Sequence, residues 1–199
     1  MSQNLRIAIA DDEPDMREYF QKILPRLGHR VVAAAQTGAE LIEQCRIHQP
    51  DLVITDIKMP DLDGIDAAAQ IHQERPVPII LVSAYHSTRL IERAEADHVL
   101  GYLVKPIKQA DLMPTIALAM RRFEQFQALS AEAADLRQAL DDRKVIEKAK
   151  GVLMKQGGLE EQDAFRRLQK LATSQNRKLI EVAQVVLHEE SARQPPARN

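Results

Sequence analysis

Five short, mostly apolar runs alternate with segments of helical periodicity in the first half of the chain. Each run is too short for a helix and is bounded by residues that favour turns. The runs occupy residues 6–10, 31–35, 51–55, 78–83 and 102–104, and the helical segments occupy 15–27, 38–49, 64–74 and 87–96. Because this alternation is typical of strands that are buried on both faces, it predicts an α/β fold with a doubly wound, five-stranded parallel sheet.

Composition excludes several other classes of protein. Hydrophobic residues make up 45% of the 199 residues and charged residues 28%, which argues against a disordered chain or a collagen-like repeat. The single cysteine, Cys45, cannot form an internal disulfide and fits a reducing compartment. No apolar stretch approaches the roughly 18 residues of a membrane span, and no signal-peptide pattern is present. We therefore expect a soluble, cytoplasmic protein with no membrane contact.

Charge is distributed unevenly along the chain. Residues 1–120 carry 12 basic and 17 acidic side chains, whereas residues 143–178 carry 10 basic and 4 acidic ones. An acidic first half and a basic later segment predict two modules with different partners.

Polar side chains follow four of the five predicted strands. Asp11 and Asp12 follow the first strand, Asp56 follows the third, Ser83 ends the fourth and Lys105 follows the fifth. In a sheet of order 2-1-3-4-5, these strand ends meet at one edge and bring three carboxylates together. Their mutual repulsion favours a bound cation, and an all-oxygen site suits Mg²⁺. Such a site suits a phosphoryl group, with Asp56 as the nucleophile that forms an aspartyl phosphate.

The same residues resemble the receiver domain of bacterial response regulators over residues 5–122. The matching segments are Ile9-Ala10-Asp11-Asp12-Glu13, Thr55-Asp56-Ile57-Lys58-Met59-Pro60, Asp63-Gly64, Leu81-Val82-Ser83-Ala84 and Val104-Lys105-Pro106. The resemblance implies a flavodoxin-like fold and transfer of phosphate from a sensor histidine kinase to Asp56. It also implies that Mg²⁺ is held directly by Asp12 and Asp56, by the Lys58 carbonyl, and by Asp11 through water.

The resemblance assigns further roles near the phosphoacceptor. Ser83 and Tyr102 match the family's hydroxyl and aromatic switch positions, and Lys105-Pro106 matches a peptide bond that is usually cis in the family. Lys58, two residues after the phosphoacceptor, is expected to alter the lifetime of the phosphate. Phosphatases of the haloacid dehalogenase type also form an aspartyl phosphate, but they need an Asp where Lys58 stands. We therefore expect a phosphoacceptor with at most autocatalytic phosphorylation and dephosphorylation, and not a turnover enzyme.

A long helical stretch begins near Asp111 and continues to Asp142 without glycine. Its apolar residues recur alternately three and four apart, which is the spacing of a coiled-coil seam. The seam consists of Phe126, Leu129, Ala133, Leu136 and Leu140. This spacing predicts a homodimer, either constitutive or induced by phosphorylation. A helix that packs on its own domain is the alternative.

Three shorter helices are predicted after Asp142, and the third is expected to have Asn176 as its N-cap. Lys and Arg concentrated on a small bundle provide the phosphate contacts of nucleic-acid binding. Charge does not separate RNA from DNA, and a basic face can simply be solvated. A helix-turn-helix that binds duplex DNA and a protein-binding adaptor therefore stay open as alternatives.

The C-terminal part of the chain resembles the ANTAR output domain. The matching segments are Lys148-Ala149-Lys150-Gly151-Val152-Leu153-Met154, Asp163-Ala164-Phe165-Arg166-Arg167-Leu168 and Lys178-Leu179-Ile180-Glu181-Val182-Ala183. The resemblance implies binding of paired hairpin loops in nascent RNA and antitermination of transcription, with the transcription machinery as a partner. The family's motif supports Ala149, Lys150, Gly151 and Arg166 as RNA contacts, whereas Lys148 and Arg167 rest on charge and placement.

The predicted organisation has four parts. A phosphoacceptor receiver domain covers residues 1–122, and a coiled-coil linker helix covers 123–142. An all-α three-helix ANTAR domain covers 143–190, and a disordered tail covers 191–199.

Overall fold

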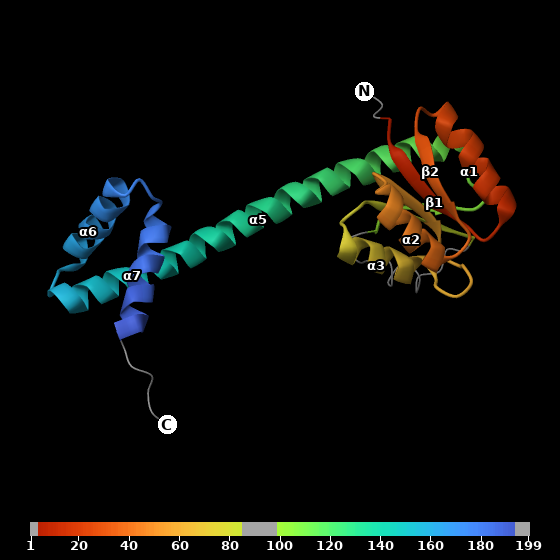
Figure 1. Ribbon diagram of the computed structural model, residues 1–199. Coiled ribbons are helices and arrows are strands. Elements are labelled where there is room, and N and C mark those ends of the chain that lie inside the picture. Colours follow the sequence, from red (N-terminus) through yellow and green to blue (C-terminus); the bar gives the residue numbers. More distant parts are fainter. Residues whose placement is uncertain (1–3, 85–98, 194–199) are drawn as a thin grey trace. The chain divides into compact units, whose positions relative to one another are not determined.

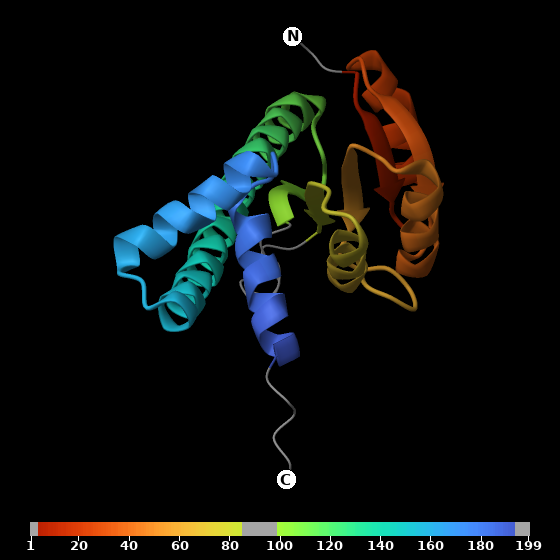
Figure 2. The same ribbon diagram turned by 60° about the vertical axis from the view of Figure 1, so that its left-hand side comes forward.

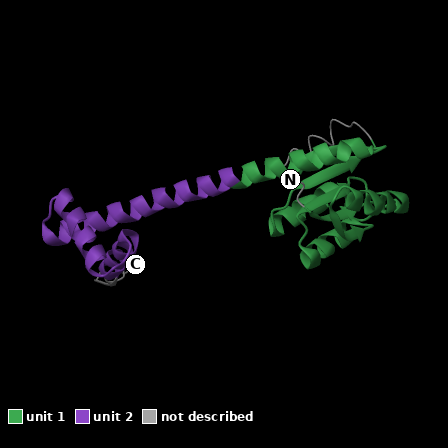
Figure 3. Ribbon diagram, turned by 90° about the horizontal axis from the view of Figure 1, so that it is seen from above, with its two compact units in different colours: residues 1–127 green, residues 128–199 purple. Residues whose placement is uncertain are grey.

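A computed structural model describes residues 4–84 and 99–193 of the chain (Figure 1). Its elements are β1 (Arg6–Ala10), α1 (Pro14–Arg26), β2 (Arg30–Ala35), α2 (Gly38–His48), β3 (Leu52–Asp56), α3 (Gly64–Glu74), β4 (Ile79–Ser83), β5 (Val99–Val104), α5 (Gln109–Gly157), α6 (Glu161–Ser174) and α7 (Leu179–Arg193). The helix predicted at 87–96 lies outside the described residues. Two compact units divide the chain into residues 1–127 and 128–199 (Figure 3).

The first unit is built on a five-stranded parallel sheet in the order β2-β1-β3-β4-β5. This order confirms the predicted flavodoxin-like topology. Strands β3 and β4 are buried along their whole length, as expected for strands with helices on both faces. Two apolar cores lie on opposite faces of the sheet, one with α2 and α3 and the other with α1 and the start of α5 (Figure 1).

Local sequence signals account for where the helices begin. Pro14 occupies the first turn of α1, where its missing N–H costs no hydrogen bond. Thr37 caps α2 by accepting a hydrogen bond from the Glu40 amide at 3.2 Å, while Glu40 accepts one from the Gln36 amide at 2.8 Å. Asp63 caps α3 by accepting from two backbone amides at 3.0 and 2.9 Å. These caps fix the loops that follow the strands.

The second unit is a helical bundle formed by the C-terminal part of α5 together with α6 and α7 (Figure 2). Small and aliphatic side chains fill its core. They are Ala149, Leu153, Ala164, Leu168, Ala172, Val182 and Ala183. Within the described residues, no helix of either unit is both long and apolar enough to cross a membrane.

Three details of the helical part differ from the sequence predictions. Helix α5 runs without a break through Asp142, so the predicted linker helix and first bundle helix are one helix. Asn176 is not an N-cap: its φ is +49°, it follows the end of α6, and α7 begins only at Leu179. Asn tolerates this left-handed conformation, which ends α6. Residues 191–193, predicted as tail, belong to α7, and 194–199 lie outside the described residues.

The predicted seam of α5 is largely exposed. Leu129, Leu136 and Leu140 keep 67%, 60% and 59% of their surface accessible in the single chain. Phe126 instead lies beside the receiver, with its ring centroid 6.5 Å from that of His72 in α3. The three leucines therefore form an apolar stripe on α5 that is exposed in the described part of the chain.

Candidate functional site

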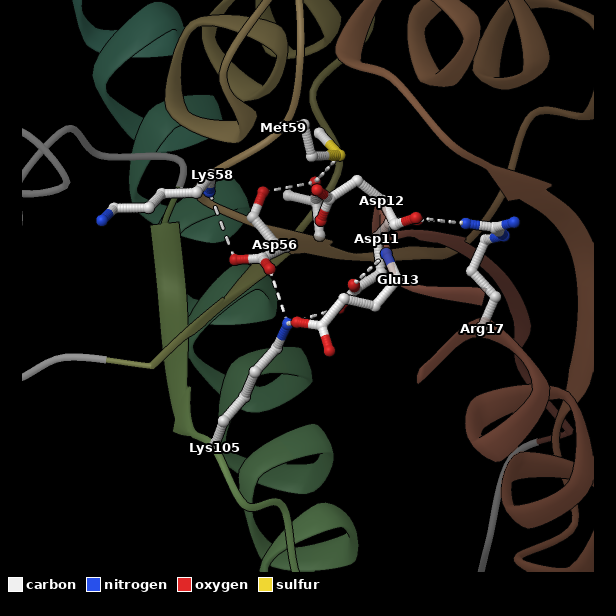
Figure 4. A network of polar contacts seen from close by, with 9 residues as sticks. Asp11, Asp12, Glu13, Arg17, Asp56, Lys58, Met59 and Lys105 are labelled. Carbon is white, nitrogen blue, oxygen red and sulfur yellow. Dashed lines mark hydrogen bonds and ion pairs between the residues drawn. The ribbon is translucent and has the colours of Figure 1, made fainter. Parts of the chain in front are cut away.

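Four acidic side chains gather at the carboxyl edge of the sheet (Figure 4). Asp11, Asp12 and Glu13 follow β1, and Asp56 is the last residue of β3. Strands β1 and β3 are direct neighbours, with Ala10 paired to Thr55, so their ends lie side by side. Each acid offers an oxygen within 4.8 Å of the others. The predicted convergence of Asp11, Asp12 and Asp56 is present, and Glu13 joins it.

Lys105 connects these carboxylates. It follows β5, and its Nζ lies 2.6 Å from Asp56 Oδ2, 3.0 Å from Asp11 Oδ2 and 2.9 Å from Glu13 Oε1. The side chains of Asp11 and Asp56 are almost fully buried, and that of Lys105 is 13% exposed. The peptide bond between Lys105 and Pro106 is cis. One ammonium group thus contacts three of the four clustered carboxylates, so the four acids together with Lys105 carry a net negative charge.

Burial and pairing shift two pKa values in this cluster. Loss of solvation raises the pKa of Asp11, although its contacts with Lys105 oppose that shift. For Lys105, burial acts to lower the pKa, but hydrogen bonds to Asp56, Glu13 and Asp11 outweigh burial and raise it. Lys105 is therefore a permanent cation at neutral pH. The Asp11 carboxylate would be stabilised by a further positive charge.

The donor set of this cluster fits a hard divalent cation. Carboxylates from two strand ends converge, and the backbone next to Asp56 is held close because the Lys58 amide donates to Asp56 Oδ1 at 3.2 Å. All side-chain ligands are oxygens, which Mg²⁺ prefers. Receiver domains typically bind Mg²⁺ at such a cluster.

Arg17 is a functional candidate that the sequence did not reveal. From the first turns of α1, its Nη1 donates to the Asp11 carbonyl at 2.8 Å and to the Asp12 carbonyl at 3.0 Å (Figure 4). The Glu13 amide also donates to Asp11 Oδ1 at 3.0 Å. These contacts hold the backbone of the acidic loop after β1 in place. A lone arginine in an amphipathic helix gives no sequence signal for such a contact.

The two predicted switch residues stand on neighbouring strands. Ser83 is buried at the end of β4, which pairs with β3 on one side and with β5 on the other. Tyr102 is half-buried in β5 and packs against the core cluster on the α2 and α3 face. Ser83 therefore lies one strand away from Asp56, at the same edge of the sheet.

The predicted RNA contacts fall into two groups in the bundle. Lys148, Arg166 and Arg167 are exposed, and Gly151 is half-buried. A Cβ added to Gly151 would meet nothing within 4 Å among the described residues. By contrast, Ala149 is fully buried in the bundle core, and Lys150 is only 7% exposed. Lys148, Arg166 and Arg167 are therefore accessible to a ligand, whereas Ala149 and Lys150 are buried within the bundle.

Comparisons with known proteins match both units. The model of the response regulator receiver domain matches residues 7–117, and that of the ANTAR domain matches residues 134–187. The chain is 42% identical over 182 residues to the transcriptional regulatory protein PdtaR of Mycobacterium tuberculosis, covering 92% of this chain and 89% of that protein. It is also 40% identical to the chemotaxis protein CheY of Bacillus subtilis, over 53% of this chain and 88% of CheY.

Solved structures support the fold of the first unit. The signal receiver domain of the putative response regulator NarL from Mycobacterium tuberculosis matches with a TM-score of 0.56 and 26% identity. That match covers 60% of this chain and 98% of the NarL receiver domain.

Proposed function

Because the chain belongs to the response regulators, with a receiver domain and an RNA-binding ANTAR output domain, we propose that a sensor histidine kinase phosphorylates Asp56 and thereby controls RNA binding. The observation that carries this proposal is the contact of Lys105 with Asp56 at 2.6 Å within a cluster of buried acids. The chain acts as a regulator, with at most autocatalytic phosphorylation and dephosphorylation, rather than as a turnover enzyme.

The Asp56 carboxylate is the nucleophile of the transfer. One of its oxygens forms the bond to phosphorus as the bond between phosphorus and the donor's leaving group breaks. Lys105 pairs with a phosphoryl oxygen, and the Ser83 hydroxyl donates to another. Asp12, Asp56 and the Lys58 carbonyl would hold Mg²⁺, with Asp11 acting through water, and the bound ion would offset the negative charge of the phosphoryl group.

RNA binds to the exposed basic face of the bundle. Lys148 on α5 and Arg166 and Arg167 on α6 are exposed cations that can contact phosphates. Gly151 costs helix stability, and no neighbour in the described chain explains its missing side chain. A close approach of an RNA loop to the α5 backbone would explain it, as would a close approach of a second helix. Paired hairpins in nascent RNA are the proposed target, which links the protein to antitermination in the cytoplasm and to the transcription machinery.

A homodimer through α5 presents two such faces. The stripe of Leu129, Leu136 and Leu140 has coiled-coil spacing and is exposed among the residues that the structure describes. Leu140 and the core residue Ala149 are nine residues apart, or two and a half helical turns, so they lie on opposite sides of α5. Pairing through the stripe therefore leaves α6 and α7 on the outside of each chain. Gly151 lies about three turns from Leu140 and shares the side of the stripe.

The phosphoacceptor is tested with Asp56→Asn. The amide nearly preserves shape but cannot act as the same nucleophile, so a small phosphodonor with Mg²⁺ should no longer produce a base-labile acyl phosphate. Asp12→Ala is the matched comparison and should weaken Mg²⁺ binding first and phosphorylation only as a consequence. Intact-mass measurement detects the added phosphate, and circular dichroism confirms that the variants are folded. Acyl phosphate that persists on Asp56→Asn would place the acceptor elsewhere.

The nucleic-acid target is tested by competition. Hairpin RNA and duplex DNA of equal length compete for the full chain at one fixed salt concentration, because affinity depends steeply on salt. We expect preferential binding of hairpin RNA. Preference for duplex DNA would favour a helix-turn-helix output, and binding of neither would favour a protein-binding adaptor.

A further inference from the structure

Lys150 is a buried cation between α5 and α6 whose two carboxylate partners are exposed to solvent, Glu147 by 52% and Glu161 by 69% of their side-chain surface. Its Nζ lies 2.9 and 3.0 Å from the two carboxylate oxygens of Glu147 and 2.7 Å from Glu161 Oε1. The ammonium also stands 5.8 Å from the centroid of the Phe165 ring. Glu147 belongs to α5, whereas Glu161 and Phe165 belong to the first turns of α6. Lys150 therefore ties the two helices together at the corner where the chain turns.

The geometry leaves Lys150 little capacity to bind anything else. An ammonium has three N–H donors, and the three hydrogen bonds to carboxylate oxygens use all of them. The residue is only 7% exposed. A phosphate could reach Nζ only by displacing two carboxylates. Lys148, two residues earlier on the same helix, is exposed and has no such enclosure.

We infer that Lys150 is a positioning residue of the RNA-binding face: it clamps α6 onto α5 and does not itself contact RNA. The clamp fixes Phe165, which directly precedes Arg166 and Arg167, relative to Lys148 and Gly151 on α5. The exposed cations of the two helices then keep a constant spacing. This inference rests on the proposed RNA-binding function, but the clamp itself can be tested without RNA.

The salt dependence of RNA binding separates a clamp from a contact. Each phosphate contact contributes about 0.7 to the slope of log K against log salt for single strands. In the full chain, Lys148→Met should reduce the slope by about 0.7, because it removes such a contact. Lys150→Met should weaken hairpin RNA binding by the same factor at every salt concentration, so that the slope of log K against log salt stays that of the unmodified chain. An equal loss of slope in both variants would overturn the inference.

A charge swap tests the clamp through folding as well. Lys150→Glu places three carboxylates together and should lower both the unfolding temperature of the full chain and its RNA affinity. Adding Glu161→Lys restores the pairing and should recover both. If the double variant recovers its unfolding temperature but not its RNA affinity, Lys150 contacts RNA; if it recovers neither, the clamp is wrong. Absence of RNA binding by the unmodified protein would count against the proposed function alone, since the unfolding temperatures still test the clamp.

Discussion

Two glycines within helices occupy opposite kinds of surroundings. Gly64 begins α3, and a Cβ placed on it would lie 1.9 Å from the carbonyl oxygen of Asp56. Its amide donates to the Ile57 carbonyl at 2.8 Å, so the loop after Asp56 is folded tightly onto the helix. Gly151 is in the middle of α5 and would meet nothing among the described residues. The first glycine permits the tight loop after the phosphoacceptor, and the second lies in open space, where we propose that RNA approaches α5.

Replacing these two glycines by alanine should therefore change the stability of the fold in opposite directions. Gly64→Ala should destabilise the receiver by about 1–3 kcal/mol, because the backbone of Asp56 must move, and it should slow phosphorylation. Gly151→Ala should stabilise α5 by about 1 kcal/mol and weaken hairpin RNA binding. Urea unfolding and RNA titration measure both effects. Unchanged RNA affinity in Gly151→Ala would remove Gly151 from the RNA contacts.

Cys45 should be chemically inert in the folded protein. It lies on the buried face of α2, and loss of solvation raises the pKa of its thiol to about 12. Because the thiolate is the reactive species, alkylation by iodoacetamide at pH 8 should be very slow in the native chain and rapid in urea. Mass spectrometry over time gives both rates. Comparable rates in the two conditions would contradict the burial of Cys45.

The positions of individual site residues were predictable from sequence when those residues lie at the carboxyl end of a predicted strand. Asp11, Asp56 and Lys105 converge because parallel strands place their carboxyl ends at one edge. Arg17 and Lys150 were not predictable in their observed roles, since each depends on contacts made only in the folded chain. Asn176 was wrongly predicted as the N-cap of α7, because asparagine favours both N-caps and the left-handed conformation that ends a helix.

At the scale of elements, α5 combines two apolar stripes on one helix. The stripe of Leu129, Leu136 and Leu140 is exposed, whereas Ala149 and Leu153 face the bundle core. Sequence periodicity located the first stripe, but it placed a boundary at Asp142 where the helix continues, and Ala149 was expected to contact RNA rather than to lie in a core. Nothing in the local sequence there, neither Gly nor Pro, interrupts the hydrogen bonding of the helix.

The exposed stripe can be tested with two lysine substitutions on the same helix. Leu136→Lys should weaken the dimer, because pairing would bring two added charges together in an apolar seam. Ala131→Lys adds the same charge nine residues before Leu140, on the opposite side of the helix, and should leave the dimer intact. Analytical ultracentrifugation compares them with the unmodified chain. Equal dimerisation of the two variants would show that the stripe is not the interface.

At the scale of the whole molecule, α5 is the element that belongs to both units. The receiver match ends at residue 117 and the ANTAR match begins at 134, and both boundaries lie within this single helix. We expect phosphorylation of Asp56 to shift Ser83 and Tyr102 and to favour a dimer that engages two hairpins at once. Linking two binding sites raises affinity because the second contact becomes intramolecular.

The most direct test of this account measures the affinity of the full chain for a two-hairpin RNA and for a single hairpin, with and without a small phosphodonor and Mg²⁺. The same titrations are made with Asp56→Asn. We predict that the phosphodonor tightens two-hairpin binding of the unmodified chain by about tenfold or more, as tethering of a second site allows. We expect little change in affinity for the single hairpin, and no change in the affinity of Asp56→Asn for either RNA. Equal tightening in Asp56→Asn, or no tightening in the unmodified chain, would contradict control of RNA binding through Asp56.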